Sequence, residues 1–160
     1  MAASFAEFEQ DFLQFTSEIV WCTVTTVDPQ GRPRSRILHP LWQMIDGLPV
    51  GWVFTNKSPL KARHLAANPH VACSYWSPAQ NTVMIDCVAD WVEDAATKRQ
   101  IWDLFMTTPP PLGYDLRAFG VPGPDSPAFT PLRLDPWRVQ VLRFAGFGNR
   151  PRMWRADIQQ

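Results

Sequence analysis

The chain has 160 residues, 46% of them hydrophobic, and its 15 basic and 15 acidic side chains give a formal net charge of zero. A chain of this length can bury a core by itself, so residues 1–160 are expected to form a single domain. Zero net charge provides no general attraction to nucleic acid or to anionic membranes, and neither is expected as a partner.

Eight tryptophans and sixteen prolines favour strands and turns over a helical bundle. The three cysteines, Cys22, Cys73 and Cys87, include no close pair such as C-x-x-C, so we predict buried free thiols in a reducing cytoplasm and no metal site. The N-terminus lacks the basic and apolar regions of a signal peptide, and no apolar run is long enough to span a bilayer. We therefore expect a cytoplasmic protein.

An amphipathic helix is predicted at the start of the chain, within residues 1–17. Ser4 and Glu7 have the spacing of a capping box, which marks the beginning of a helix. Four phenylalanines then follow at helical spacing and predict a face turned toward the core: Phe5, Phe8, Phe12 and Phe15.

Seven segments with strand-like composition or period-two alternation are separated by turn residues. They are Ile19–Val27, Arg34–Trp42, Val50–Thr55, Val71–Trp76, Thr82–Val92, Phe129–Leu134 and Trp137–Phe144. The last two are expected to form a hairpin around Asp135-Pro136. Few helices interrupt these strands, which argues against a doubly wound sheet and predicts a closed or nearly closed antiparallel barrel.

The segment after the third of these strands is built like an anion site. Ser58 is a natural N-cap, Pro59 suits the first helical position, and the helix is expected to end at Asn68, before Pro69. Lys61 lies in the first turn, where a lysine opposes the helix macrodipole. A bound phosphate would explain this placement, because exposed N–H groups and an ammonium would converge on it.

Arginines on a neighbouring strand add to this positive charge. Arg34 and Arg36 lie on one face of the predicted strand Arg34–Trp42, because side chains two residues apart point to the same side. Two strands and one helix N-terminus can therefore present several cations to a single anion.

The second half of the chain contains one further helix and a long proline-rich segment. Asp94 can cap a helix that runs to about Met106. Residues 107–131 then carry seven prolines, which exclude a helix or a central strand and predict a long ordered loop. Such loops are often functional in compact domains. The tail, residues 145–160, is rich in arginine and is expected to fray or to dock on a partner.

The order and spacing of these motifs resemble the pyridoxamine 5'-phosphate oxidase-like family of flavin-binding split barrels. That family has a strand with the pattern R-x-x-L, a strand ending in [FY]-T-N, a lysine five residues after that asparagine, and a helix closing with N-P-x-V. The corresponding segments are Arg36–His39, in which His39 stands at the position of the leucine, Phe54–Asn56, Lys61 and Asn68–Val71. The resemblance covers Ile19 to Glu93 and becomes looser up to Phe144. It implies a mainly β fold, a six- or seven-stranded antiparallel split β-barrel of Greek-key type with a few peripheral helices.

The resemblance also implies FMN bound at the interface of a homodimer. The residues that it assigns to cofactor binding are Arg36, Ile37, Leu38, His39, Phe54, Thr55, Ser58, Lys61 and Thr82. Arg36, Ser58 and Lys61 would hold the phosphate, because a guanidinium suits bidentate phosphate contact. The others would follow the flavin ring, partly through backbone groups. His39 is also a candidate acid/base residue, although a lone histidine on a strand is usually structural.

The chain departs from the true oxidases at three places. Leu60 stands where those enzymes have an arginine, and Thr82 stands where they have a glutamine that contacts the flavin. Their C-terminal motif, a histidine flanked by arginines, grips pyridoxal phosphate and has no counterpart, because Asn149–Arg155 contains no histidine. We therefore expect a flavin-dependent oxidoreductase that acts on an unidentified small molecule other than a vitamin B6 phosphate.

Two further functions fit the same residues. Related split barrels bind a deazaflavin coenzyme in the same groove, so a deazaflavin-dependent reductase is the first alternative. The second is a non-catalytic flavin-binding or stress-associated protein, which holds the cofactor without turnover. The absorbance of purified protein separates FMN from deazaflavin, and turnover with a reductant separates an enzyme from a carrier.

Overall fold

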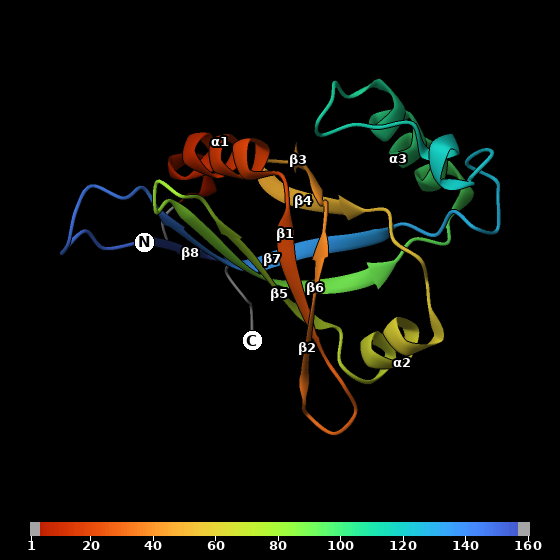
Figure 1. Ribbon diagram of the computed structural model, residues 1–160, viewed down its shortest axis with the longest axis horizontal. Helices are drawn as coiled ribbons and strands as arrows, with labels where there is room; N and C mark the ends of the chain where they lie inside the picture. The colour runs from red at the N-terminus through yellow and green to blue at the C-terminus, as the bar shows by residue number, and fades with distance from the viewer. Residues whose placement is uncertain (1–3, 157–160) are drawn as a thin grey trace.

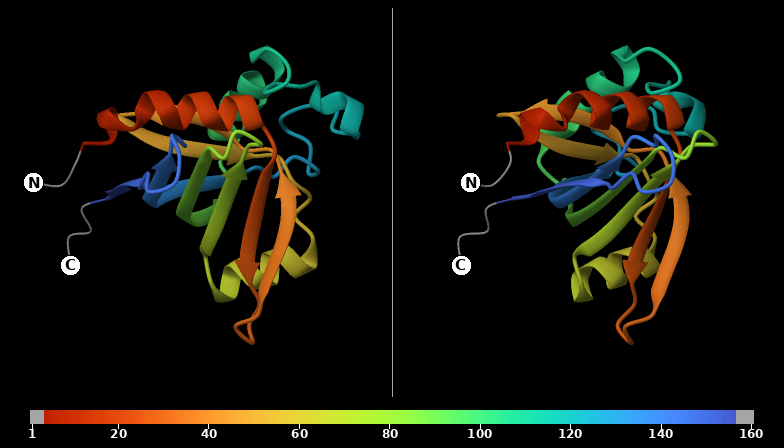
Figure 2. Two further views of the ribbon diagram at one scale, coloured as in Figure 1. Left: turned by 60° about the vertical axis from the view of Figure 1, so that its left-hand side comes forward. Right: turned by 90° about the vertical axis from the view of Figure 1, so that its left-hand side faces the viewer.

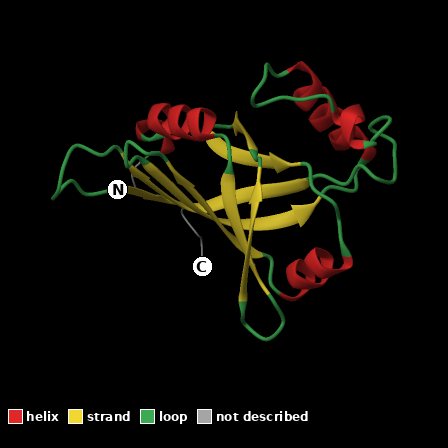
Figure 3. Ribbon diagram, viewed as in Figure 1, coloured by secondary structure: helices red, strands yellow, loops and turns green. Residues whose placement is uncertain are grey.

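The computed structural model describes residues 4–156, which contain eight strands, three α-helices and two short 3-10 helices. The strands are β1 (Cys22–Val27), β2 (Pro33–Leu38), β3 (Leu41–Ile45), β4 (Leu48–Val53), β5 (His70–Trp76), β6 (Thr82–Trp91), β7 (Leu132–Leu142) and β8 (Arg152–Arg155). The helices are η1 (Phe5–Glu7), α1 (Glu9–Ile19), α2 (Pro59–Ala67), α3 (Ala95–Thr107) and η2 (Leu116–Phe119). The helices lie around the periphery of the sheet (Figures 1 and 3).

All strand pairs are antiparallel, and the sheet order is β2-β1-β5-β6-β7-β4-β3, with β8 paired to β7. The two edge strands of this path, β2 and β3, are consecutive in the chain, and the sheet between them is strongly curved (Figure 2). No backbone ladder joins β2 to β3 within residues 4–156, so the barrel is split at that seam. The predicted mainly β, antiparallel split-barrel fold is confirmed, with one strand more than the upper estimate of seven.

The phenylalanine stripe packs into the main core, which confirms this part of the prediction. Its four members are at most 3% exposed: Phe5, Phe8, Phe12 and Phe15. They share one cluster with inward side chains of β1, β5, β6 and β7. The start of the helix differs from the predicted capping box, because Ser4 Oγ accepts a hydrogen bond from Ala6 N at 3.4 Å and caps η1. The regular helix α1 then begins at Glu9.

The predicted strand Arg34–Trp42 is wrong as a single strand, because the chain turns at His39-Pro40. Pro40 has no N–H to continue the ladder with β1, and β2 ends at Leu38. Leu41 begins β3, which pairs with β4 instead of β1. This turn carries the chain from one edge of the split barrel to the other.

One prediction at the C-terminal end is also wrong. The hairpin expected at Asp135-Pro136 does not form, because both residues lie inside the continuous strand β7. The register with β6 shifts between Asp86 and Cys87, and this irregularity explains how a proline is tolerated within the sheet. The tail was expected to fray or to dock on a partner. Within it β8 pairs with β7, and residues 157–160 lie outside the described part of the chain.

A second core joins α3 to β3 and β4, and the proline-rich segment covers it. Phe105 of α3 and Leu116 of η2 are completely buried in this cluster. The helix η2 is a correction, because the prolines of residues 107–131 were expected to exclude any helix. A Cβ at Gly113 would lie only 1.9 Å from the carbonyl oxygen of Thr108, so the segment folds closely back on the end of α3.

The three cysteines are free and at most 1% exposed, which confirms the prediction of buried thiols. Within residues 4–156, no group of three or more histidine, cysteine, aspartate or glutamate side chains is arranged to hold a metal ion. No helix in the same part of the chain has the length and apolar character needed to cross a membrane.

Candidate functional site

Ser58 and Lys61 lie at the N-terminus of α2, just after β4. Ser58 caps the helix as predicted, because its Oγ accepts a hydrogen bond from Lys61 N at 3.3 Å. The side chain of Lys61 turns back toward β4, where its Nζ donates to Thr55 Oγ1 at 2.5 Å. Thr55 is buried, so the helix presents its ammonium to a partly enclosed corner of the molecule.

Arg36 reaches the same corner from β2. Both terminal nitrogens of its guanidinium donate to Thr26 Oγ1 on β1, each at 3.0 Å. Thr26 Oγ1 also lies 3.1 Å from Nδ1 of His64 on α2. His64 is 1% exposed and faces β1. The weak apolar periodicity of the nine-residue helix α2 gave no signal for its buried face.

Arg36 and Lys61 are two half-buried cations without a countercharge. Within residues 4–156 no ion pair joins either side chain to a carboxylate, and their partners are two threonine hydroxyls. Burial lowers the pKa of both groups, and the charge of Arg36 lowers the pKa of Lys61 further. Two neighbouring cations in a partly desolvated corner are unfavourable alone and favourable around an anion. The corner therefore has the charge and the donors of an anion site.

A cleft of about 580 Å³ opens beside this corner, between the β1–β2 hairpin and α2. Arg36 lies in its wall together with Arg34 and Arg63. Arg36 is thus accessible from solvent through a basic surface.

A second pocket, of about 400 Å³, lies at the end of β2 and is mostly apolar. Its walls contain four of the residues assigned to the cofactor by the sequence: Ile37, Leu38, His39 and Phe54. The remaining lining residues are Trp21 and three residues of the proline-rich segment: Pro111, Tyr114 and Phe119. None of these eight lining residues is an acid, a lysine or an arginine. Such a pocket is typical of sites for flat organic molecules.

His39 is held in this aromatic pocket between two rings. Its ring centroid lies 5.4 Å from that of Trp21 and 5.4 Å from that of Tyr114. Burial lowers the pKa of His39, so the imidazole is neutral at pH 7. Within the described part of the chain, its Nε2 is buried without a hydrogen-bond partner. An unpaired ring nitrogen in a pocket wall can bond to a ligand.

Thr82 is not brought together with the other assigned residues. It begins β6 opposite Trp76 of β5, and β6 is three strands away from β2 in the sheet. At the usual strand spacing this separation is roughly 14 Å. The next residue, Val83, is completely buried, so Thr82 points to the opposite, outer face of the sheet.

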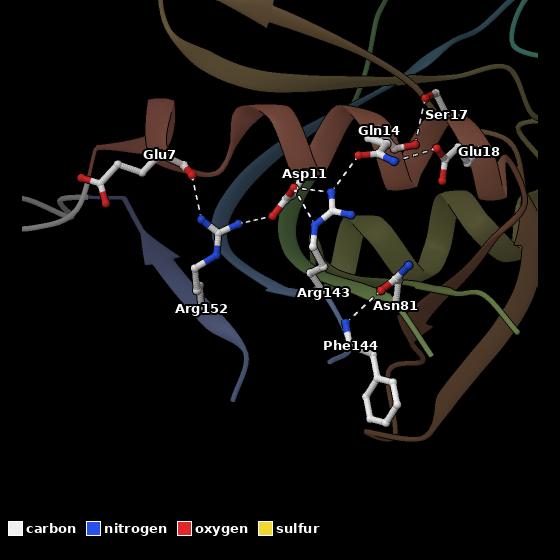
Figure 4. Close-up of polar contacts among 9 residues, drawn as sticks. All are labelled: Glu7, Asp11, Gln14, Ser17, Glu18, Asn81, Arg143, Phe144 and Arg152. Atoms are coloured by element: carbon white, nitrogen blue, oxygen red, sulfur yellow. Dashed lines mark hydrogen bonds and ion pairs between the residues drawn. The ribbon is translucent and has the colours of Figure 1, made fainter. Parts of the chain in front are cut away.

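Two arginines near the C-terminus, Arg143 and Arg152, contact α1 (Figure 4), and neither lines the two pockets described above. Arg143 Nη2 donates to Asp11 Oδ1 at 2.6 Å, and Arg152 contacts the second oxygen of the same carboxylate. Arg152 also donates to the carbonyl oxygen of Glu7 at 2.9 Å. These partners are 132, 141 and 145 residues apart, so local sequence pattern could not pair them. Their positive charge is used to hold α1 on the sheet.

Comparison with known proteins gives an independent result. The sequence matches the family model described as pyridoxamine 5'-phosphate oxidase over residues 8–140. A pyridoxine/pyridoxamine 5'-phosphate oxidase of Ralstonia nicotianae is 34% identical over 89 residues, which are 55% of this chain and 41% of that protein. The corresponding oxidase of Pseudomonas entomophila is 42% identical over 57 residues, 36% of this chain and 25% of that protein. The chain thus spans less than half the length of the curated relatives it matches.

Solved structures share the fold at low sequence identity. A pyridoxamine 5'-phosphate oxidase-related, FMN-binding protein of Nostoc punctiforme gives a TM-score of 0.70 at 19% identity, with 100% of this chain and 94% of that chain covered. A Clostridium acetobutylicum protein related to general stress protein 26 gives a TM-score of 0.71 at 19% identity, with 94% of this chain and 96% of that chain covered. Because the family match extends over most of its length, this chain belongs to the pyridoxamine 5'-phosphate oxidase-like family.

Proposed function

We propose that this chain is a cytoplasmic flavoprotein that binds FMN and acts as a flavin-dependent oxidoreductase on a small organic molecule. The observation that carries the proposal is that Arg36 and Lys61, which have no ion pair within residues 4–156, lie next to an uncharged aromatic pocket. The cations suit a phosphate and the pocket suits a flat ring, which are the two ends of FMN. The FMN-binding protein of Nostoc punctiforme, which has the same fold, supports this choice of cofactor.

The hydrogen-bond donors at this corner suit the phosphate group of FMN. An arginine carries five N–H donors and a lysine three, so Arg36 and Lys61 keep several after their bonds to Thr26 and Thr55. The start of α2 adds backbone N–H groups and the positive end of the helix dipole. A phosphate at this place would neutralise both cations, which is the interaction that the protein alone does not supply.

The ring end would lie against Ile37, Leu38 and Phe54. The flavin supplies the hydride chemistry when it is bound, and the protein supplies position and surroundings. The aromatic walls would exclude water from the reacting face. His39 is a group in these walls that can accept or give a proton, and its lowered pKa keeps the imidazole neutral at neutral pH, with Nε2 free of a hydrogen-bond partner in the described part of the chain.

A homodimer with the cofactor at its interface is part of this proposal. Trp21, Ile37 and Trp76 are 62%, 60% and 55% exposed, which is high for large apolar side chains. Strand register and alternation place Ile37, Trp76 and Thr82 on the same outer face of the sheet. A second copy covering this face would bury these side chains. It would also let Thr82 reach a cofactor bound in the other copy.

A vitamin B6 phosphate is a poor candidate for the substrate. The aromatic pocket has no cation to bind a second phosphate, and Arg143 and Arg152 are occupied by Asp11. A site without polar partners for a charged group loses much of the binding energy that discriminates such substrates. We therefore expect negligible oxidation of pyridoxine 5'-phosphate.

Native mass spectrometry and absorbance spectra of the purified protein test the proposal. We expect two subunits with two bound FMN molecules, the yellow flavin spectrum, and reduction of that flavin by a chemical or nicotinamide donor. A deazaflavin mass with absorption at shorter wavelength would replace FMN by the alternative coenzyme. Protein that holds FMN but never turns over with any donor and acceptor would be a carrier. A monomer with full FMN affinity would contradict the interface site.

A further inference from the structure

The basic cleft is larger than a single phosphate requires. Its volume of about 580 Å³ lies in the range of about 300–1,000 Å³ that is usual for whole small-molecule ligands. It runs between the β1–β2 hairpin and α2, which lie side by side in Figures 1 and 2. Arg36, one of the two cations proposed above to bind the phosphate, lies in its wall, so that phosphate would lie at the edge of the cleft. The remaining space has its own set of charges.

Four arginines line the cleft, and one carboxylate faces them. The four arginines are Arg32, Arg34, Arg36 and Arg63. The carboxylate is Asp28, whose Oδ2 accepts from Arg32 Nε at 2.7 Å, whereas Arg34 lies 3.9 Å from the same oxygen. Within residues 4–156, Arg63 has no ion pair. After Asp28 has neutralised Arg32, the cleft therefore carries excess positive charge on Arg34 and Arg63, beyond the phosphate site.

The hairpin that carries these charges is fixed in shape. Asp28 is buried, and its Oδ1 accepts hydrogen bonds from the backbone nitrogens of Gln30 and Arg32, each at 2.9 Å. These bonds and the neighbouring arginine lower the pKa of Asp28, so it stays ionised at neutral pH. The hairpin tip is thus organised by the protein before any ligand binds. A preorganised basic surface binds anions at lower entropic cost than free arginine side chains on a flexible loop.

The geometry points to a nucleotide pyrophosphate as the occupant of this cleft, bound by Arg34 and Arg63 next to the flavin phosphate. This inference rests on the proposed function, because it takes the corner of Arg36 and Lys61 as the site of the first phosphate. The pyrophosphate can come from two sources. One is the cofactor itself, if its flavin is the dinucleotide FAD, whose first phosphate is the flavin phosphate at Arg36 and Lys61 and whose second phosphate would reach Arg34 and Arg63. The other is a separate nicotinamide dinucleotide that delivers electrons to the flavin.

Binding measurements on apoprotein test the first source. FAD is expected to bind at least as tightly as FMN to the wild-type protein. Arg34→Ala and Arg63→Ala should each raise the Kd of FAD by about five- to tenfold, as expected for one charge-assisted contact at a partly exposed site. The same variants should change the Kd of FMN by less than about twofold. Arg36→Ala should weaken the binding of both FMN and FAD. Arg99→Ala is the matched control, because Arg99 is an exposed arginine of α3, is paired with Asp125 of the proline-rich segment, and lies outside the cleft.

Calorimetric titration of NADPH into FMN-loaded protein tests the second source. Arg34→Ala and Arg63→Ala should then raise the Kd of NADPH by about five- to tenfold, and Arg99→Ala should leave it unchanged. An effect on FAD alone or on NADPH alone supports the inference and identifies the source. If neither ligand responds to Arg34→Ala or Arg63→Ala while FMN still binds to wild-type protein, the inference is overturned and the proposed FMN site stands. If FMN itself does not bind, the proposed function has failed first.

Discussion

Replacing Lys61 by methionine separates a binding role from a structural role. The ammonium donates to Thr55 Oγ1 at 2.5 Å, and burial together with the charge of Arg36 lowers its pKa from the ordinary value of 10.5. Lys61→Met removes one hydrogen bond, with a typical net contribution of about 0.5–1.5 kcal/mol, and it also removes a like-charge repulsion. The two changes oppose each other. We expect the unfolding free energy of the apoprotein to change by less than about 1 kcal/mol.

FMN binding should respond far more strongly than stability. A charge-assisted hydrogen bond between Lys61 and the phosphate contributes about 1.5–3 kcal/mol, so Lys61→Met should raise the Kd of FMN by about 10- to 150-fold. Arg36→Ala should act in the same way, since its guanidinium is the second cation of the corner. Riboflavin has no phosphate, and its Kd should rise by less than about threefold in either variant.

Quenching of flavin fluorescence on titration gives both dissociation constants, and urea unfolding of apoprotein gives the stability. The pH dependence of apoprotein stability provides a further test, because its direction can be predicted. Because the folded-state pKa of Lys61 lies below 10.5, the unfolded state holds this proton to higher pH. The wild-type apoprotein should therefore gain stability as pH rises through the folded-state pKa toward 10.5, and Lys61→Met should lose this gain. Equal losses for FMN and riboflavin, or apoprotein destabilised by more than about 2 kcal/mol, would refute the anion site.

Three other expected outcomes concern the fold and His39. Asp11→Asn should lower the unfolding free energy by about 1–3 kcal/mol, because two arginines share that carboxylate; Glu9→Gln, on the same helix, should have little effect in the same urea experiment. Gly113→Ala should lower the melting temperature by several degrees, because its methyl group would overlap a backbone oxygen. The His39 pKa, measured by NMR, should lie below 6.5; stability should then fall as pH drops below 6.5, because the unfolded chain takes up this proton first, and His39→Gln should flatten that fall.

Features that depend on spacing within one element could be predicted from the sequence. The phenylalanine stripe follows helical periodicity and is buried. Ser58 and Pro59 mark the start of α2 because a cap needs only a side-chain oxygen and a suitable first residue. The lysine in the first turn of that helix was informative because it conflicts with the local dipole. A local conflict of this kind signals a partner that lies outside the segment.

Features that depend on pairing between distant segments could not be predicted in this way. Pro136 looked like a turn residue, and only the irregular register with β6 makes it acceptable inside β7. His64 lies on a short helix with weak apolar periodicity, and only its contact with Thr26 on β1 explains its burial. The ion pairs of Asp11 join the two ends of the chain. Each case needs the tertiary arrangement, which local composition does not contain.

The identity of two buried threonines determines what the cation corner can do. Thr26 and Thr55 are 3% and 7% exposed, and each accepts from one of the two cations. An aspartate at either place would pair with its cation, satisfy its donors and raise its pKa. The apoprotein would then hold a buried ion pair, and an incoming phosphate would meet a carboxylate. A hydroxyl orients the same donors without cancelling their charge. The corner therefore keeps both cations in position and leaves their neutralisation to a ligand.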